Sequence, residues 1–281
     1  MFELIYRYDP DRPSTRAAPV DAAEARDQLE EGNRTFARLG TAPHGTHVVE
    51  FDLEDIGVTA EGKAPKQQPF AVVLGCADAR VPIELIFDRA CNELFVVRVA
   101  GNILGPRQIG SVEYAVEHLG ANLKLLVVLG HSHCGAVTAA VDAFLKPGDY
   151  LDLLGSHHIR SIVNDLFPSV RGAAAALTGR WGDDVVKRPG YRAALIEAAV
   201  VVNAALVAAT LYEEFVRPNH DLRVVFGVFD LATRRVQVPL ATKDGHAAGV
   251  RLLDAPTDRE DFRALALALA DGQLVRQLLG V

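Results

Sequence analysis

The sequence predicts an α/β protein with a central, mostly parallel β-sheet flanked by helices, an N-terminal helical arm and a C-terminal helix. Short runs rich in Val and Leu suit strands that are buried on both faces of a parallel sheet, and the clearest are residues 70–74 and 124–129. Each of these runs is followed by a helical pattern. The chain has 281 residues, of which 49% are hydrophobic, so it can bury a sizeable core in one domain with extensions.

The chain divides into three parts by its patterning. Prolines at positions 10, 13 and 19 are expected to break any regular element in the first twenty residues. Asp21 then caps a helical pattern that stops at Gly32, and this arm is expected to pack on a partner subunit. The expected division is an arm at 1–40, a central α/β domain at 41–240 and an extension with a helix at 241–281.

Within the central domain, glycine and proline mark most of the element boundaries. Pro82 suits the first position of a helix, and Gly120 suits the end of another helix that Ser111 caps. The expected strands are 47–53, 70–74, 94–99, 124–129, 222–229 and 236–238. The expected helices are 82–89, 111–119, 136–145, 159–176, 191–216 and a single tail helix after Thr257.

Bulk properties exclude several classes of function. The net charge of −7 argues against nucleic acid as the main partner. Three cysteines, an odd number without a small-domain framework, favour a reducing compartment. The first residues lack the basic start and apolar core of a signal peptide, and the uncharged apolar run 198–212 is too short to span a bilayer and contains Asn203. The expectation is a cytoplasmic protein without a membrane partner.

Two strand ends carry side chains that bind metals. Cys76 follows the run at 70–74, and an H-x-x-C segment, His131 to Cys134, follows the run at 124–129. Ligands gather at the carboxyl ends of parallel strands, so neighbouring strands would bring these groups together. Two thiolates and one imidazole suit zinc, and three ligands leave a position open, as in catalytic zinc sites. His133 competes with His131 as the imidazole ligand.

Charged residues beside these positions have two interpretations. Asp78 and Arg80 can form an exposed ion pair of little energetic worth. Beside a metal, the same Asp can accept a hydrogen bond from a water and orient its lone pair toward a substrate. Arg98 admits a structural role, in which it pairs with a carboxylate at a strand end.

Four segments in order, CADARVP, FVVRVAGN, GSVEYAVEHLG and GHSHCGAV, resemble the β-class carbonic anhydrases, whose pattern is C-x-D-S-R followed by H-x-x-C. The resemblance runs from about Ala22 to about Val238. It implies that Cys76, His131 and Cys134 bind one zinc ion per chain, and its spacing favours His131 over His133.

The resemblance also implies roles for the neighbouring residues. Asp78 and Arg80 would form the family's carboxylate–guanidinium dyad: in the open form Asp78 pairs with Arg80, and in the closed form it occupies the fourth metal position. Gln67 stands where the family often has a glutamine that donates to bicarbonate across a dimer interface. Gly135, next to Cys134, is expected at the substrate position.

This sequence departs from the family pattern at two positions. Ala79 replaces the serine between Asp and Arg, which removes a hydroxyl near the site but no ligand. Val73 stands where some closed-form members have a tryptophan that helps to form a non-catalytic bicarbonate pocket. The absence of this tryptophan favours an open, non-allosteric site, whereas Ala79 concerns the tuning of the site.

The function implied is reversible hydration of carbon dioxide to bicarbonate and a proton by a zinc-bound hydroxide, in a homodimer or a dimer of dimers. Because two thiolates cancel the charge of zinc, turnover is expected to rise toward alkaline pH. One alternative is a carbon disulfide or carbonyl sulfide hydrolase on the same fold, and another is a non-catalytic zinc- or bicarbonate-binding homologue. A thiol redox protein is disfavoured because the chain has no C-x-x-C.

Overall fold

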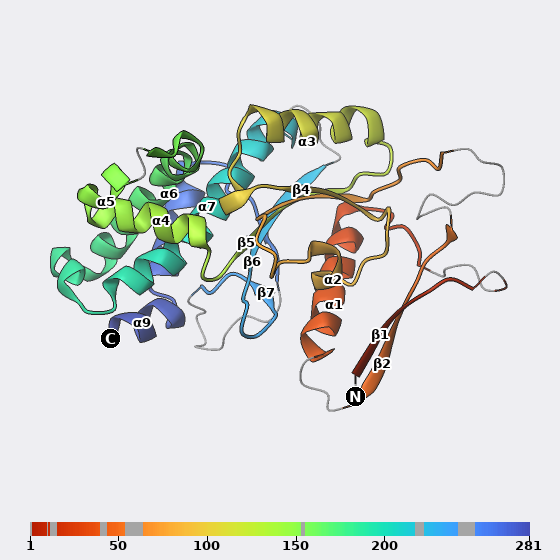
Figure 1. The fold of residues 1–281 in the computed structure, drawn as a ribbon, viewed down its shortest axis with the longest axis horizontal. Helices are drawn as coiled ribbons and strands as arrows, with labels where there is room; N and C mark the ends of the chain where they lie inside the picture. The colour runs from red at the N-terminus through yellow and green to blue at the C-terminus, as the bar shows by residue number, and fades with distance from the viewer. Residues whose placement is uncertain are drawn as a thin grey trace.

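A six-stranded sheet forms the centre of the protein (Figure 1). The computed structural model describes residues 2–9, 11, 16–39, 44–53, 64–152, 155–216, 222–240 and 251–281. The strand order is β4-β3-β5-β6-β7, and β8 also pairs with β6. The strands are β3 (Ala71–Gly75), β4 (Leu94–Arg98), β5 (Leu125–His131), β6 (Arg223–Phe229), β7 (Val236–Gln237) and β8 (Leu253–Asp254). Only β7 and β8 run antiparallel to their neighbour in this sheet, so the predicted mostly parallel sheet is confirmed.

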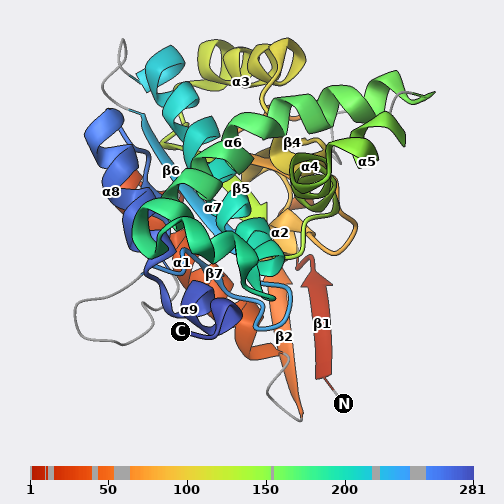
Figure 2. The same cartoon turned by 90° about the vertical axis from the view of Figure 1, so that its left-hand side faces the viewer.

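Helices cover both faces of the sheet (Figures 1 and 2). One face carries α1 (Ala22–Leu39) and the short α2 (Ile83–Ile86). The other face carries a thicker layer: α3 (Pro106–Leu119), α4 (Gly135–Leu145), α5 (Pro147–Asp152), α6 (His157–Trp181), α7 (Tyr191–Leu211), α8 (Arg259–Ala270) and α9 (Gln273–Leu279). Short helical turns are η2 (Ala100–Asn102), η4 (Asp183–Lys187) and η5 (Tyr212–Val216).

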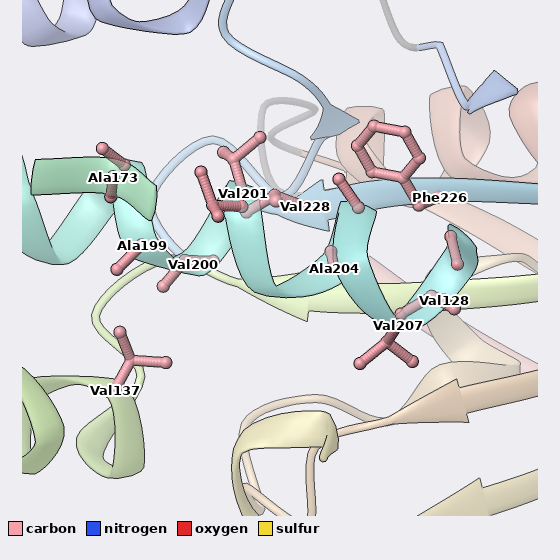
Figure 3. Packing of buried hydrophobic residues seen from close by; sticks show 14 of the residues in the cluster. Val128, Val137, Ala173, Ala199, Val200, Val201, Ala204, Val207, Phe226 and Val228 are labelled. Atoms are coloured by element: carbon pink, nitrogen blue, oxygen red, sulfur yellow. The ribbon is translucent and has the colours of Figure 1, made fainter. Parts of the chain in front are cut away.

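Alternation along the strands divides the core between these two layers, because successive side chains of a strand point to opposite faces. Val73 and Val127 lie in the cluster under α1 and α2, whereas Val72 and Val128 lie in the cluster under α7. Figure 3 shows valines and alanines of α7 beside side chains of β5 and β6. Those labelled include Val200, Val201, Ala204 and Val207 of α7, Val128 of β5, and Phe226 and Val228 of β6.

The register of β3 and β5 positions the functional residues. The two strands pair in parallel, with Val73 opposite Val127 and Gly75 opposite Leu129. Their carboxyl ends therefore meet at one edge of the sheet, and the residues that follow β3 lie beside the end of β5.

Several helix boundaries differ from the sequence-based expectation: α2 is shorter than 82–89, α6 is longer than 159–176, and α5 was not expected. The physical reason is clear at two further boundaries. Helix α1 does not stop at Gly32 but continues to Leu39, because Gly32 serves close packing rather than termination: a Cβ there would lie 1.8 Å from the Phe87 carbonyl oxygen. Helix α3 begins at Pro106 rather than at Ser111, whose hydroxyl donates to the Arg107 carbonyl from within the helix. A proline at the first position fits this earlier start.

The arm contains a strand that the sequence analysis missed. β1 (Phe2–Arg7) precedes the three prolines and pairs in parallel with β2 (Gly45–Glu50), and the two form a ribbon that extends from the body (Figure 1). Helix α1 packs on its own chain in this structure. The Asn33 amide donates to the Ile86 carbonyl at 3.1 Å and its oxygen accepts from the Val236 N–H at 2.7 Å. The packing of the arm on a partner subunit stays a prediction.

The tail is part of the core and is not a single helix. Helices α8 and α9 are separated at Asp271 and Gly272, where a Cβ on the glycine would lie 2.4 Å from the Pro239 carbonyl oxygen. Residues 241–250, at the start of the expected extension, lie outside the described residues. The buried side chains of Leu252 and Leu269 join the same clusters as the strands, so the described part of the extension shares one core with the central domain.

Helix α7 with η5 forms a long apolar segment. Tyr191–Val216 is long and apolar enough to cross a membrane by length and composition, which the shorter run considered in the sequence was not. However, 78% of its most apolar window is buried inside the protein. Its apolar composition is thus explained by its place between the sheet and α6.

Candidate metal centre

Three side chains meet where β3 and β5 end. Cys76 directly follows β3, His131 is the last residue of β5, and Cys134 precedes the first residue of α4. Their ligand atoms all lie within 4.8 Å of one another, and all three residues are buried. Within the described ranges, this is the one group of three or more His, Cys, Asp and Glu side chains that could hold a metal ion.

The ring of His131 is prepared to bind a metal. Its Nδ1 lies 3.0 Å from the Ser132 carbonyl oxygen, which can only accept, so Nδ1 carries the proton and Nε2 carries a lone pair. Nε2 is buried and has no hydrogen-bond partner. A buried polar atom without a partner is costly unless something absent from the structure satisfies it, and a metal ion fits this requirement. His133 is exposed, so the competition between the two histidines is resolved in favour of His131.

The two cysteines affect each other's pKa through the hydrogen bond between their side chains. A hydrogen bond from the Cys134 thiol lowers the pKa of Cys76 to about 4, and hydrogen bonds from backbone amides add to this effect against the opposing effect of burial. The same thiol bond, together with burial, raises the pKa of Cys134. Cys76 Sγ also accepts a hydrogen bond from the Gly101 N–H at 3.3 Å. Two cysteine sulfurs, which bind a metal as thiolates, and one imidazole nitrogen form a donor set that fits zinc.

A carboxylate faces the same point from the loop after β3. Arg80 holds Asp78 through two parallel contacts, from Nε to Oδ1 at 3.0 Å and from Nη2 to Oδ2 at 2.7 Å. Asp78 Oδ2 lies 3.8 Å from His131 Nε2, beyond hydrogen-bond reach. The Arg80 guanidinium holds the pKa of Asp78 well below its usual range, so the carboxylate stays ionised. This pairing is the arrangement expected for the open form.

Arg98, the last residue of β4, holds this loop in place. Its guanidinium donates to the Cys76 carbonyl at 3.0 Å and to the Asp78 carbonyl at 2.6 Å. The structural role considered for Arg98 in the sequence analysis agrees with these bonds, but the acceptors are backbone oxygens and not a carboxylate. Arg98 thereby connects the first sulfur ligand with the residue that carries the carboxylate.

The remaining predicted site residues lie in different places. Gly135 opens α4 beside Cys134, and a Cβ built there would meet nothing within 4 Å. Gln67 is exposed and precedes β3, and its neighbour Gln68 bonds the Asn92 side chain near the start of β4. Gln67 therefore lies at the amino edge of the sheet, opposite the metal ligands of its own chain.

Sequence reasoning missed two polar groups behind the ligands, both on α7. Glu197 accepts a hydrogen bond from the His133 backbone N–H at 3.1 Å, and Asn203 donates to the Gly101 carbonyl at 2.8 Å. The signal that could have found them is a polar side chain within an otherwise apolar helix. Asn203 was noted only because it interrupts the apolar run.

Fold and site together define an α/β protein with a three-ligand metal centre at the carboxyl ends of two parallel strands. A sequence model of the family described as "Carbonic anhydrase" matches residues 71–236, which include every ligand of this centre. The chain therefore belongs to the carbonic anhydrase family, and its motifs are those of the β class.

Curated relatives match the same region. Carbonic anhydrase 2 of Mycobacterium tuberculosis is 41% identical over 155 residues, which are 54% of this chain and 64% of the relative. The carbonic anhydrase of Mycolicibacterium smegmatis is 44% identical over 152 residues, which are 54% of this chain and 65% of the relative. The match thus spans less than two thirds of the length of either relative.

Solved structures of β-carbonic anhydrases are also similar to this chain. The β-carbonic anhydrase CcaA has a TM-score of 0.49 at 23% identity, covering 66% of this chain and 85% of CcaA. The Coccomyxa β-carbonic anhydrase in complex with acetazolamide has a TM-score of 0.48 at 23% identity, covering 70% of this chain and 82% of that one.

Proposed function

We propose that this protein catalyses the reversible hydration of carbon dioxide to bicarbonate and a proton, with one zinc ion per chain bound by Cys76, His131 and Cys134. The observation that carries the proposal is the open three-ligand group with an ionised, arginine-held carboxylate beside it. Structural zinc sites have four protein ligands, whereas a three-ligand group leaves room for a reactant. Membership of the family supports the same reaction.

Zinc, when bound by these ligands, supplies Lewis acidity that lets water act as a nucleophile near neutral pH. The chain's own contribution begins with its two sulfurs and one imidazole, which fix where the ion sits. The Ser132 carbonyl and the Gly101 N–H orient two of these ligands from behind. Such outer contacts fix ligand geometry and basicity.

Asp78 orients the reacting water in this proposal. Because its pKa is held below the usual range, it accepts a hydrogen bond but is a poor acceptor of the proton itself. Arg80 fixes both carboxylate oxygens, so the lone pair of the water is directed toward the substrate rather than left free to rotate. The proton then passes to buffer.

The positions of two residues support the proposed substrate space and the proposed assembly. Gly135 would leave space for substrate next to Cys134 because it has no side chain. Gln67 lies at the opposite edge of the sheet, so it could reach a bicarbonate only in the site of another subunit. We therefore propose a homodimer or a dimer of dimers. We also propose that the protein is located in the cytoplasm, binds carbon dioxide and bicarbonate, and has no nucleic acid or membrane partner.

Stopped-flow hydration of carbon dioxide, on protein of measured zinc content, tests the proposal. We expect activity at one zinc per chain that rises between about pH 7 and about pH 9, because two thiolates make the metal less acidifying than three histidines would. Zinc-loaded protein without activity at either pH would contradict it. Carbon disulfide and carbonyl sulfide are assayed in parallel, and faster turnover of either one would assign the site to a sulfur analogue instead.

A further inference from the structure

One buried amide on α7 is not explained by packing. Asn203 is only 3% exposed, in a helix whose neighbouring side chains are almost all apolar. Its Nδ2 donates to the Gly101 carbonyl at 2.8 Å, and its Oδ1 accepts from the Ser169 hydroxyl on α6 at 3.1 Å. Both ends of the side chain are thus engaged, and one of them holds η2, the turn that follows β4.

The residue that Asn203 holds also contacts a metal ligand. The Gly101 N–H donates to Cys76 Sγ at 3.3 Å, so the carbonyl of Gly101 is held by Asn203 while its N–H faces the sulfur. Gly101 has a φ of 70°, in the left-handed region that favours glycine. A Cβ there would approach Ala136 Cβ and Leu166 Cδ1 at 3.2 Å. The turn therefore lies against both α4 and α6 and has little freedom to move.

An N–H that donates to a thiolate withdraws electron density from the sulfur and fixes its direction. Contacts of this kind, made behind the ligands, typically change metal affinity by roughly 10–100-fold. The Gly101 N–H makes such a contact with Cys76 Sγ at 3.3 Å. The effect of the Gly101 N–H on the Cys76 sulfur depends on the direction of the N–H bond. That direction depends on the contacts that hold Gly101 in place.

We propose that Asn203 is a positioning residue of the metal centre: it fixes Gly101 so that the Gly101 N–H is directed at the Cys76 sulfur. The inference rests on the metal assignment in the proposed function but not on the carbon dioxide reaction. The competing explanation is that Asn203 only joins α6, α7 and η2 and so stabilises the fold. The two explanations differ in whether the Cys76–metal bond changes.

The chain offers a matched control in Asn33. It is also a fully buried asparagine whose side chain bonds backbone groups, namely the Ile86 and Arg234 carbonyls and the Val236 N–H. It lies under the other face of the sheet and bonds none of the ligands. Asn33→Ala therefore removes a comparable buried amide without touching the metal centre.

The first measurement is Zn²⁺ affinity by chelator competition, with the cobalt-loaded absorption spectrum alongside it. Asn203→Ala is expected to weaken zinc binding by about 10–100-fold and to shift the sulfur-to-cobalt charge-transfer band. Asn33→Ala is expected to lower the urea midpoint of unfolding but to leave both metal readouts unchanged. Equal effects of the two variants on zinc affinity and the cobalt band, or no effect of Asn203→Ala on either, would overturn the proposal.

A second measurement needs no variant that might fail to fold. In wild-type protein loaded with ¹¹³Cd, a hydrogen bond to a metal-bound sulfur transmits scalar coupling between the metal and the amide proton. We expect the Gly101 amide proton to correlate with cadmium. Its absence from that spectrum would overturn the proposal whatever the variants do. If the metal readouts are as expected but zinc-loaded wild-type protein does not hydrate carbon dioxide, the proposed function is contradicted and the role of Asn203 is not.

Discussion

Asp78 and Arg80 have separable roles from the three ligands, since neither lies within the ligand group and the carboxylate is 3.8 Å from the nearest ligand nitrogen. Substituting Asp78 should therefore affect the reaction and not the metal. Asp78→Asn keeps the size of the side chain but loses its charge. We expect full zinc content by elemental analysis and hydration activity lower by at least about 100-fold. Full activity in this variant would refute the role given to Asp78.

Cys134 should behave in the opposite way, because it supplies a sulfur to the metal. Cys134→Ala is expected to lose zinc and activity together, since two ligands bind the ion far more weakly than three. Cys91→Ala is the matched control, because Cys91 is a free, exposed cysteine outside the group. A Cys134→Ala protein that retains one zinc per chain after dialysis would exclude this sulfur as a ligand.

Glu197 gives the metal-free protein a pH-dependent stability. Burial raises its pKa above its ordinary value of 4.5, and the His133 N–H only partly offsets this. Between the ordinary and the raised pKa, the folded state keeps a proton that the unfolded state has lost, so the free energy of unfolding falls as pH rises through that window. Glu197→Gln cannot titrate and should lack this fall.

Urea unfolding of metal-free wild type and Glu197→Gln, from about pH 4 to about pH 8, checks this sign. The free energy of unfolding of the wild type should decrease relative to that of the variant as pH rises. A difference between the two proteins that stays constant with pH would show that the carboxyl of Glu197 titrates equally in the folded and unfolded states.

At the scale of elements, the strands and helices near the site could be predicted because local pattern and tertiary environment agree there. The runs 70–74 and 124–129, which precede Cys76 and His131, have apolar side chains on both faces of the sheet because helices cover both faces. The misplaced boundaries have a different origin. Gly32 has the local character of a helix end, but its role is set by a carbonyl that is distant in sequence. Single-residue patterns do not report such contacts.

Gly32 therefore supplies a test of how α1 docks. A Cβ would lie 1.8 Å from the Phe87 carbonyl oxygen, so Gly32→Ala forces the helix away from α2. We expect a loss of about 1–3 kcal/mol in the free energy of unfolding, as for other overpacked sites. Gly179→Ala in α6 is the control, because a Cβ there meets nothing within 4 Å and should be neutral or slightly stabilising. Equal stability of the two variants would show that α1 does not dock as described.

At the scale of the whole molecule, the described part of the C-terminal extension completes the core outside the region that the family model matches. The guanidinium carbons of Arg180 and Arg276 lie 4.2 and 5.2 Å from the ring centroid of the single tryptophan, Trp181. Asp271 bonds both arginines. This cluster joins the end of α6 to the tail.

Removal of residues 251–281 should therefore destabilise the whole protein rather than release an independent tail. The deletion takes away side chains that are buried in both clusters, including Leu252 and Leu269. We expect a lower melting temperature and a red-shifted emission of Trp181, because its ring would become exposed to water. Unchanged emission and melting would mean that the tail does not dock on α6.

The three ligands of the candidate site could be predicted from the sequence, but the residues that hold the surrounding backbone in place could not. Cys76, His131 and Cys134 stand at strand ends in a recognisable spacing, and the structure brings them together. Arg98 and Asn203 bond to backbone atoms, and such bonds have no spacing rule. Their partners are fixed only when the strands and α7 are in place. Gln67 is the remaining case, since its role depends on a second chain.

The parallel pairing of β3 and β5 has a consequence for how the protein acquires its metal. His131 and Cys134 are neighbours in the chain, whereas Cys76 reaches them only after β3 has paired with β5. A parallel pair needs a long crossover connection and forms slowly compared with local structure. In an unfolded or newly made chain, only His131 and Cys134 of the three ligands are close together, so this site binds the ion weakly. The complete three-ligand site therefore forms only after the sheet has formed. A bound ion then stabilises the pairing of β3 with β5.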